Sequence, residues 1–195
     1  MSLQWLWSEV VIAMSINALV NRAGKPIRCV RFLLVSLTLL VASGQNAIAL
    51  EVGESLPSLS FPMLIDGTAG EPIAMNEFRG KLIYLDIWAS WCQPCRQSMP
   101  VLADLRREFG DRQFEVVAVN VDEKLTDALR FLRKTPVEYP ILLDPKGTLP
   151  RAFSLIAMPT SYLIGPDGVV LYRHTGFKKS DIPELKIMIE AFLPE

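Results

Sequence analysis

Three short stretches of the chain are almost continuously hydrophobic, and two amphipathic stretches separate them. The hydrophobic stretches have the length of buried β-strands and cover residues 81–88, 114–121 and 140–143. In the amphipathic stretches, apolar residues recur at helical spacing, over residues 96–109 and 125–134. Strands without a polar face that alternate with helices are typical of parallel sheets covered on both sides. The pattern therefore predicts right-handed βαβ units.

Shorter elements are predicted on either side of these units. Before residue 81, we expect a strand over residues 59–64 that turns at Asp66-Gly67, a returning segment at 72–74 and a helical turn at 76–78. After residue 143, we expect a helical turn at 148–153, a hairpin of 160–164 and 169–174 around Gly165-Pro-Asp-Gly168, and a last helix at 181–193. The order of elements predicts an α/β sandwich with a mixed central sheet flanked by helices.

An export segment is predicted near the N-terminus. Residues 32–42 are apolar and uncharged, and an Ala-Ile-Ala site follows at residues 47–49. Three cations precede the apolar run: Lys25, Arg28 and Arg31. This arrangement predicts a signal peptide that is cleaved after Ala49. The alternative is an uncleaved membrane anchor over residues 32–50, which contain no charge and have just the length needed to span a bilayer.

These boundaries divide the chain into an N-terminal extension at residues 1–49 and one domain at residues 50–195. In either case the domain is exported to a periplasmic or other extracytoplasmic location. Half of the 195 residues are hydrophobic, which is ample for a packed core. The formal net charge is −1 for the whole chain and about −4 without residues 1–49. A balance without excess positive charge argues against a nucleic-acid-binding protein.

Two cysteines remain once the signal segment is removed, Cys92 and Cys95, and they form a C-x-x-C motif. A disulfide across so short a loop constrains little of the unfolded chain, so we expect the pair to be chemically active. Cys92 lies at the predicted start of a helix, where free N–H groups and the helix dipole stabilise a thiolate. We expect Cys92 to attack a partner disulfide and the more covered Cys95 to resolve the mixed disulfide. Trp88 and Trp91 are predicted to form an apolar docking surface.

A metal site is the main alternative for these thiols. Zinc would require two further ligands, whereas residues 50–195 offer a single histidine, His174. A copper chaperone could use both thiolates and His174. We expect His174 to lie at the surface or on an edge strand. The favoured hypothesis is therefore redox chemistry at the two cysteines, without a metal or other cofactor.

The motif YLDIWASWCQPC at residues 84–95, together with IAMPT at 156–160, resembles the thioredoxin superfamily, and the similarity covers most of residues 55–193. The signal segment and the extra elements at 124–143 resemble the exported TlpA/ResA/DsbE-like branch. This resemblance implies a thioredoxin-like three-layer sandwich and a thiol–disulfide oxidoreductase, with reduction of protein disulfides as its expected direction. It further implies protein disulfide or dithiol substrates, a membrane thiol electron donor and, for some members, a role in cytochrome c maturation.

The resemblance assigns roles to the residues around Pro159. Pro159 matches the cis-proline beside the active-site disulfide, and its neighbours Met158 and Thr160 are expected to contribute to substrate docking. A cis bond would leave the backbone of Met158 available to pair with a partner chain. The alternative is a trans proline that opens an edge strand. A thiol peroxidase shares the fold, but its Thr-x-x-Cys loop is absent because Ala89 stands three residues before Cys92.

Asp86 is the candidate acid of the site. It lies in a hydrophobic strand six residues before Cys92, as in ordinary thioredoxins, where the exported branch often has Asn. Conversely, Ser98 stands where ResA-like proteins commonly have an acidic residue. Burial should raise the pKa of Asp86 and let it accept the proton of Cys95 during resolution. The alternative is an aspartate that reaches solvent or pairs with Lys81.

Overall fold

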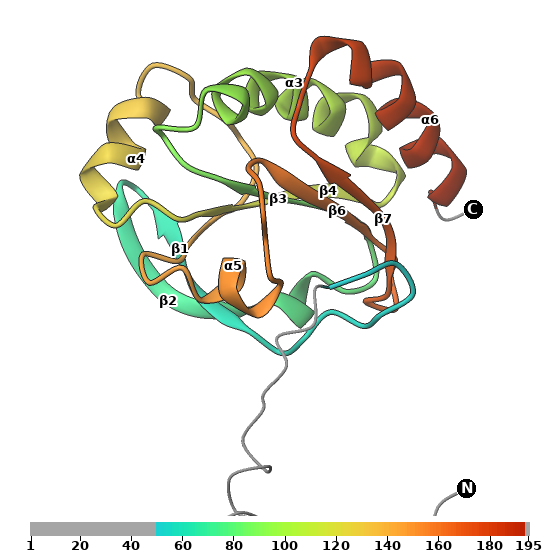
Figure 1. Ribbon diagram of the computed structural model, residues 1–195, viewed down its shortest axis with the longest axis horizontal. Helices are drawn as coiled ribbons and strands as arrows, with labels where there is room; N and C mark the ends of the chain where they lie inside the picture. The colour runs from blue at the N-terminus through green and yellow to red at the C-terminus, as the bar shows by residue number, and fades with distance from the viewer. Residues whose placement is uncertain (1–49, 194–195) are drawn as a thin grey trace, which may run out of the picture. The chain divides into compact units, whose positions relative to one another are not determined.

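The structure is a computed structural model that describes residues 50–193, and its centre is a seven-stranded mixed sheet (Figure 1). Strands β3, β4 and β5 run parallel, whereas every other pair of neighbours is antiparallel. This confirms the predicted mixed α/β sheet. In spatial order the strands are β2 (Thr68–Ala74), β1 (Ser60–Ile65), β5 (Ile141–Leu143), β4 (Phe114–Asn120), β3 (Leu82–Trp88), β6 (Thr160–Ile164) and β7 (Val170–Thr175).

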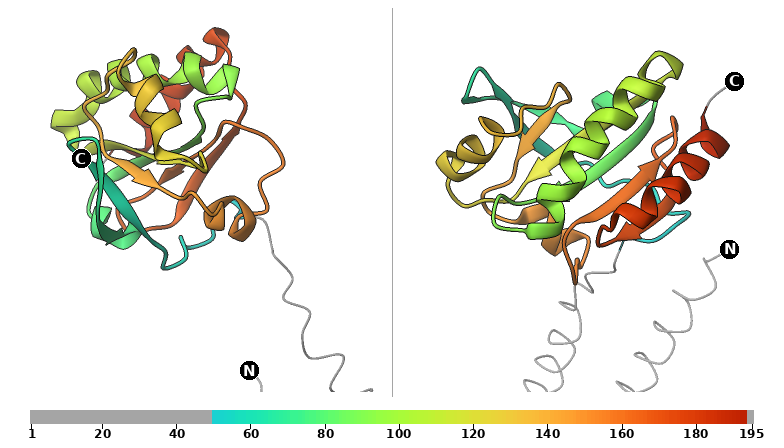
Figure 2. Two further views of the ribbon diagram at one scale, coloured as in Figure 1. Left: turned by 90° about the vertical axis from the view of Figure 1, so that its left-hand side faces the viewer. Right: turned by 90° about the horizontal axis from the view of Figure 1, so that it is seen from above.

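Helices cover both faces of the sheet and give three layers. On one face lie α3 (Gln93–Phe109), α4 (Leu125–Leu132) and α6 (Ile182–Phe192), whose buried residues pack into one hydrophobic cluster. The second face is covered by α5 (Thr148–Ala152) and the 3-10 turn η1 (Met75–Phe78). Figure 2 shows α3 and α6 side by side across the sheet. Two further 3-10 turns are η2 (Gly110–Arg112) and η3 (Lys179–Asp181).

The central strand β3 is buried along its whole length. Its side chains alternate, so that Leu82, Tyr84 and Trp88 pack on the α3 side. The residues between them pack on the α5 side, namely Ile83, Leu85 and Ile87. Burying one such aliphatic side chain contributes about 1.5–3 kcal/mol, and a slip of one residue would exchange the two faces. The register is therefore strongly fixed, and it places Asp86 on the α3 side.

Most predicted elements agree with the structure to within one or two residues, including the β6–β7 hairpin. The exceptions are β2, which is longer than the expected segment at 72–74, and α3, which begins three residues earlier than the periodicity of 96–109 suggested. An edge strand tolerates the glycine and proline of β2, and Pro94 suits a first helical turn. The predicted extension, signal peptide or anchor at residues 1–49 lies outside the described residues. Within residues 50–193, no helix is long and hydrophobic enough to cross a bilayer.

Candidate active site

The two cysteines form a disulfide at the N-terminus of α3. Cys92 caps the helix, and its Sγ accepts the backbone N–H of Cys95 at 3.3 Å. The N–H of Cys95 and the positive end of the helix dipole therefore act on the Cys92 sulfur, which favours a thiolate once the bond is reduced. Cys92 is 5% exposed and Cys95 is 0% exposed, which confirms the expectation that Cys95 is the more covered.

A buried carboxylate fixes the loop that leads into this helix. Asp122 follows β4 and accepts hydrogen bonds from both the backbone N–H and the hydroxyl of Ser90. It also accepts from the amide of Asn120 at 2.8 Å. The sequence analysis missed this residue, although an aspartate directly after a buried strand and at its carboxyl end was a usable signal. Asp122 holds the chain two residues before Cys92 in place.

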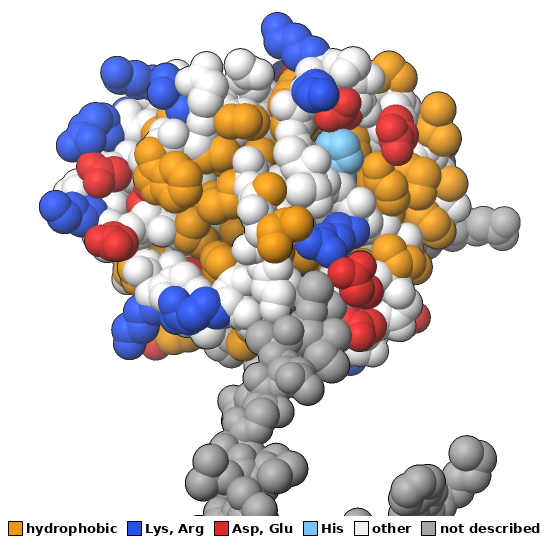
Figure 3. Space-filling view, viewed as in Figure 1, with side chains coloured by type: hydrophobic (Ala, Val, Ile, Leu, Met, Phe, Trp, Pro, Cys, Tyr) orange, Lys and Arg blue, Asp and Glu red, His pale blue; other side chains and the backbone are white. Residues whose placement is uncertain are grey.

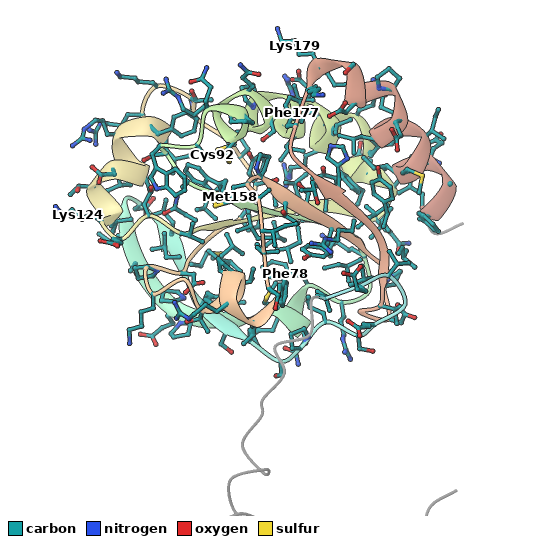
Figure 4. The ribbon with its side chains drawn as sticks, in the orientation of Figure 1. Phe78, Cys92, Lys124, Met158, Phe177 and Lys179 are labelled. Atoms are coloured by element: carbon teal, nitrogen blue, oxygen red, sulfur yellow. A yellow bond between two sulfur atoms is a disulfide. The ribbon has the colours of Figure 1, made fainter. Side chains whose placement is uncertain are left out.

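The loop before β6 contains the predicted cis-proline. The Met158–Pro159 peptide bond is cis, so the trans alternative is wrong. The carbonyl of Pro159 accepts the backbone N–H of Gly176 at 2.7 Å, and the Thr160 hydroxyl donates to the carbonyl of Ala157 at 2.8 Å. Figure 4 places Met158 on the segment entering β6, on the same side as Cys92 at the start of α3. The two residues line one groove.

This groove is mostly apolar. Trp91 is 69% exposed and Ile156 is 88% exposed, which is unusual for side chains of this size. In Figure 3 hydrophobic side chains gather in the middle of this face, between α3 and α5. Large exposed apolar patches on a protein mark surfaces that bind other molecules. The groove is lined by Trp91, Cys92, Gln93, Pro94, Pro150, Leu155, Ile156, Ala157 and Met158.

Two of the four predicted docking side chains do not reach the groove. Trp88 is completely buried, and its ring packs on Phe131 with the centroids 5.4 Å apart. Thr160 is also completely buried, and its hydroxyl stabilises the loop instead. The prediction that these side chains contact a partner is therefore wrong. Ile156 and Leu155, which the analysis of the sequence did not select, belong to the groove.

Asp86 is fully buried in the middle of β3. Its Oδ1 accepts the hydroxyl of Ser161 at 2.7 Å, and its Oδ2 has no hydrogen-bond partner among residues 50–193. Burial raises the pKa of Asp86 to about 6, and the hydrogen bond from Ser161 partly opposes this rise. The predicted rise in pKa is confirmed. The alternatives are wrong, because Asp86 does not reach solvent and forms no ion pair with any described cation, Lys81 included.

The charge of Asp86 contributes to the raised pKa values of two buried tyrosines. Burial, and secondarily the charge of Asp86, raise the pKa values of Tyr84 and Tyr139 well above that of an ordinary phenol. The Tyr139 hydroxyl donates to the carbonyl of Met99 in α3 at 3.3 Å. Both phenols therefore stay neutral through the physiological range, whereas the pKa of Asp86 lies close to that range.

His174 lies on the edge strand β7, as expected, but its ring is partly covered. Its Nε2 lies 3.2 Å from Oδ2 of Asp181, and its ring stacks on Tyr172. Among the described residues, no group of three His, Cys, Asp or Glu side chains is arranged to hold a metal ion. The structure thus does not bring His174 to the cysteines, and the copper-chaperone alternative has no structural support.

The fold and site define a thioredoxin-like thiol–disulfide oxidoreductase, because a C-x-x-C disulfide caps a helix beside a cis-proline loop in a three-layer sandwich. Comparison with protein families leads to the same class. Residues 51–189 match the Redoxin family model, and the chain belongs to that family. It is a TlpA/ResA/DsbE-like protein of the thioredoxin superfamily.

Individual relatives agree with this assignment. Thiol-disulfide oxidoreductase ResA from Bacillus thuringiensis is 28% identical over 65% of this chain and 71% of that protein. Thioredoxin-like protein YneN from Bacillus subtilis is 32% identical over 75% of this chain and 84% of its own. A crystal structure from Chlorobium tepidum, described as a thiol:disulfide interchange protein DsbE, superposes with a TM-score of 0.70 at 39% identity. That match covers 75% of this chain and 100% of the other.

Proposed function

We propose that this protein is an exported reductant of protein disulfides, in which Cys92 attacks the substrate and Cys95 resolves the mixed disulfide. The observation that carries this proposal is the unequal position of the two sulfurs. Cys92 borders an open apolar groove, whereas Cys95 is completely buried behind it. A partner protein can therefore meet Cys92 first. Trp91, Met158 and Ile156 provide the apolar surface on which an unfolded or extended segment of that partner would dock.

The proposed reaction has two exchanges. The Cys92 thiolate attacks one sulfur of the partner disulfide, the partner S–S bond breaks, and the leaving sulfur departs with the electron pair and takes up a proton. Cys95 then loses its proton to Asp86 and attacks Cys92. The bond between Cys92 and the partner breaks, and the second partner sulfur leaves as a thiolate that is protonated in turn. Two electrons pass to the partner, and the Cys92–Cys95 disulfide remains.

Turnover then requires a dithiol that reduces this disulfide again. We propose a membrane-bound thiol donor outside the cytoplasm, in keeping with the cations and apolar run at residues 25–42 and with the ResA relatives. The proposal includes delivery of the electrons to proteins of cytochrome c maturation. No second function is favoured by an observation on the described residues.

The direction of the reaction is tested by the reduction potential of the Cys92–Cys95 couple. We expect a value near that of thioredoxin, about −270 mV, because a reductant must hold its electrons less tightly than its substrates do. Equilibration of the purified domain with glutathione buffers, followed by alkylation of free thiols and mass spectrometry, measures the potential. A value near −120 mV, as in a strong oxidant, would contradict the reductant role while leaving the exchange chemistry intact.

The proposal for export predicts a mature chain that begins at Leu50. Cleavage is expected after Ala49, because the Ala-Ile-Ala site follows a short apolar run behind three cations. Intact-mass measurement of the protein isolated from the cell envelope tests this prediction. A mass that retains residues 32–49 would indicate a membrane anchor that carries the same domain, and recovery from the cytoplasm would contradict export in both forms.

A further inference from the structure

Ser161 and Asp86 form a polar pair within the core, and the buried Tyr84 of β3 also shares a side-chain hydrogen bond with Ser161. Ser161 and Asp86 lie directly opposite each other in the antiparallel pairing of β6 with β3, so their side chains share one face of the sheet. Ser161 is 3% exposed and Asp86 is 0% exposed, and their oxygens are 2.7 Å apart. A hydrogen bond from a hydroxyl to a carboxylate is strong at this distance, and burial removes the competition from solvent.

We propose that Ser161 is the positioning residue of the proton-transfer step, holding Oδ1 of Asp86 so that Oδ2 is the oxygen that receives the proton of Cys95. This inference rests on the proposed role of Asp86. A serine hydroxyl has a single proton to donate, and Oδ1 receives it. Oδ2 has no partner among the described residues, so its lone pairs remain available. Fixing one oxygen also fixes the orientation of the carboxyl group.

The step begins with a mixed disulfide between Cys92 and the partner. The S–H bond of Cys95 breaks and its proton forms an O–H bond with Oδ2, while the electron pair stays on sulfur. That thiolate attacks the Cys92 sulfur, the Cys92–Cys95 bond forms, and the partner sulfur leaves with the electrons of the broken bond. Asp86 starts the step as a carboxylate and ends it as an acid, and it returns its proton to solvent or to the leaving thiolate afterwards.

The tyrosines that surround the pair do not titrate near neutral pH. Tyr84 on β3 and Tyr139 on the loop before β5 stay neutral, because burial raises the pKa of both phenols. From α3, Cys95 faces this layer of the core. His174 stands opposite Ser161 on β7, and its ring is bound to Asp181 and Tyr172. The test therefore detects the Asp86 carboxyl directly.

The experiment compares Ser161→Ala, Ser161→Thr and Ser98→Ala in the full domain. Resolution of a preformed mixed disulfide is followed by stopped flow from pH 5 to 9, and the protonated carboxyl of Asp86 is followed by infrared difference spectroscopy. Asp86→Asn identifies its band. Each method gives the pH at which its signal is half-changed. Ser161→Ala should move the kinetic and the infrared midpoint up by about one pH unit, because the hydrogen bond that favours the carboxylate is lost. At pH values below the midpoints of the wild type and of the variant, resolution in Ser161→Ala should then be about tenfold slower than in the wild type.

Ser161→Thr keeps the hydroxyl and should keep the wild-type midpoint. Ser98→Ala is the matched control, because Ser98 is also a buried serine, but it donates to the carbonyl of Cys95 and not to Asp86. Its midpoint should not move. In the wild type, the Asp86 carboxyl band should lie at the wavenumber of a carbonyl that accepts one hydrogen bond. This last readout holds even if Ser161→Ala fails to fold.

The outcomes distinguish a failure of the role of Ser161 from a failure of the proposed function. Unchanged midpoints in Ser161→Ala, combined with slow resolution in Asp86→Asn, would overturn the positioning role of Ser161 and leave the proposed function standing. An equal shift in Ser98→Ala would also overturn it, since the effect would then belong to any buried serine. An unchanged rate of resolution in Asp86→Asn would contradict the proton-accepting role of Asp86, and the positioning role of Ser161 would then be contradicted as well.

Discussion

Cys95→Ser is expected to accumulate mixed disulfides between Cys92 and its protein substrates. The variant keeps the sulfur that borders the groove and loses the buried sulfur that would release the partner. A neighbouring thiol reacts as though present at an effective concentration of about 10⁵ M or more, far above that of any thiol in solution. The lifetime of the mixed disulfide should therefore rise about a thousandfold or more. Non-reducing electrophoresis of alkylated envelope extracts detects the adducts.

Cys92→Ser is the matched control for this experiment. It should abolish turnover and trap almost no partner, because Cys95 is completely buried and cannot reach a substrate disulfide. Both variants lose the same disulfide, so a difference between them cannot come from a general loss of stability. Adducts that form through Cys95 and not through Cys92 would show that the assigned roles of attacking and resolving sulfur are reversed.

The strand pattern made much of this site predictable. The hydrophobic run at 81–88 indicated a buried central strand, and alternation along it placed Asp86 on the same face as Trp88. The C-x-x-C motif after that strand indicated a helix start, and the structure has Cys92 as its cap. These conclusions depend on local spacing along one segment, so one sequence was enough to reach them.

Contacts between distant segments were not predictable in the same way. Trp88 and Thr160 were expected at the docking surface, yet each faces the interior because other elements cover it. Asp122 lies 32 residues from Ser90, and Ser161 lies 75 residues from Asp86. The local pattern can indicate that Asp86 or Asp122 lies beside a buried strand, but it cannot name the partner of either residue, because strand pairing and the packing of loops supply those partners.

Asp86→Asn is expected to slow the resolution step and to leave the first attack by Cys92 nearly unchanged. Asp86 lies on the face of β3 that α3 covers, and Cys95 belongs to the first turn of α3. A pKa of about 6 leaves Asp86 ionised and able to accept a proton at neutral pH. An amide cannot accept that proton. Loss of one general base costs about a hundredfold or more in the step that it serves. Stopped-flow kinetics with a disulfide substrate separates the two steps, and an unchanged rate of resolution between pH 6 and 8 would contradict the assignment.

The same substitution should change how stability depends on pH. In the native protein, burial raises the pKa of Asp86 from 3.8 to about 6, so the folded state holds this proton more tightly than the unfolded state does. Ionisation of Asp86 therefore destabilises the fold as pH rises from about 4 to 6, and the loss reaches about 3 kcal/mol above pH 7. Well below pH 4 the carboxyl is protonated in both states, and the loss disappears.

Asp86→Asn removes this titration. Urea unfolding of the oxidised domain should show a variant that gains stability over the wild type between pH 4 and 7, by at most about 3 kcal/mol. A buried amide without a partner lowers the stability of the variant by a similar amount at every pH. The test is therefore how the difference in unfolding free energy between variant and wild type changes with pH, and not its absolute value. Parallel curves for Asp86→Asn and the wild type would mean that Asp86 titrates alike in the folded and unfolded states, and its proposed readiness to accept a proton near neutral pH would lose its physical basis.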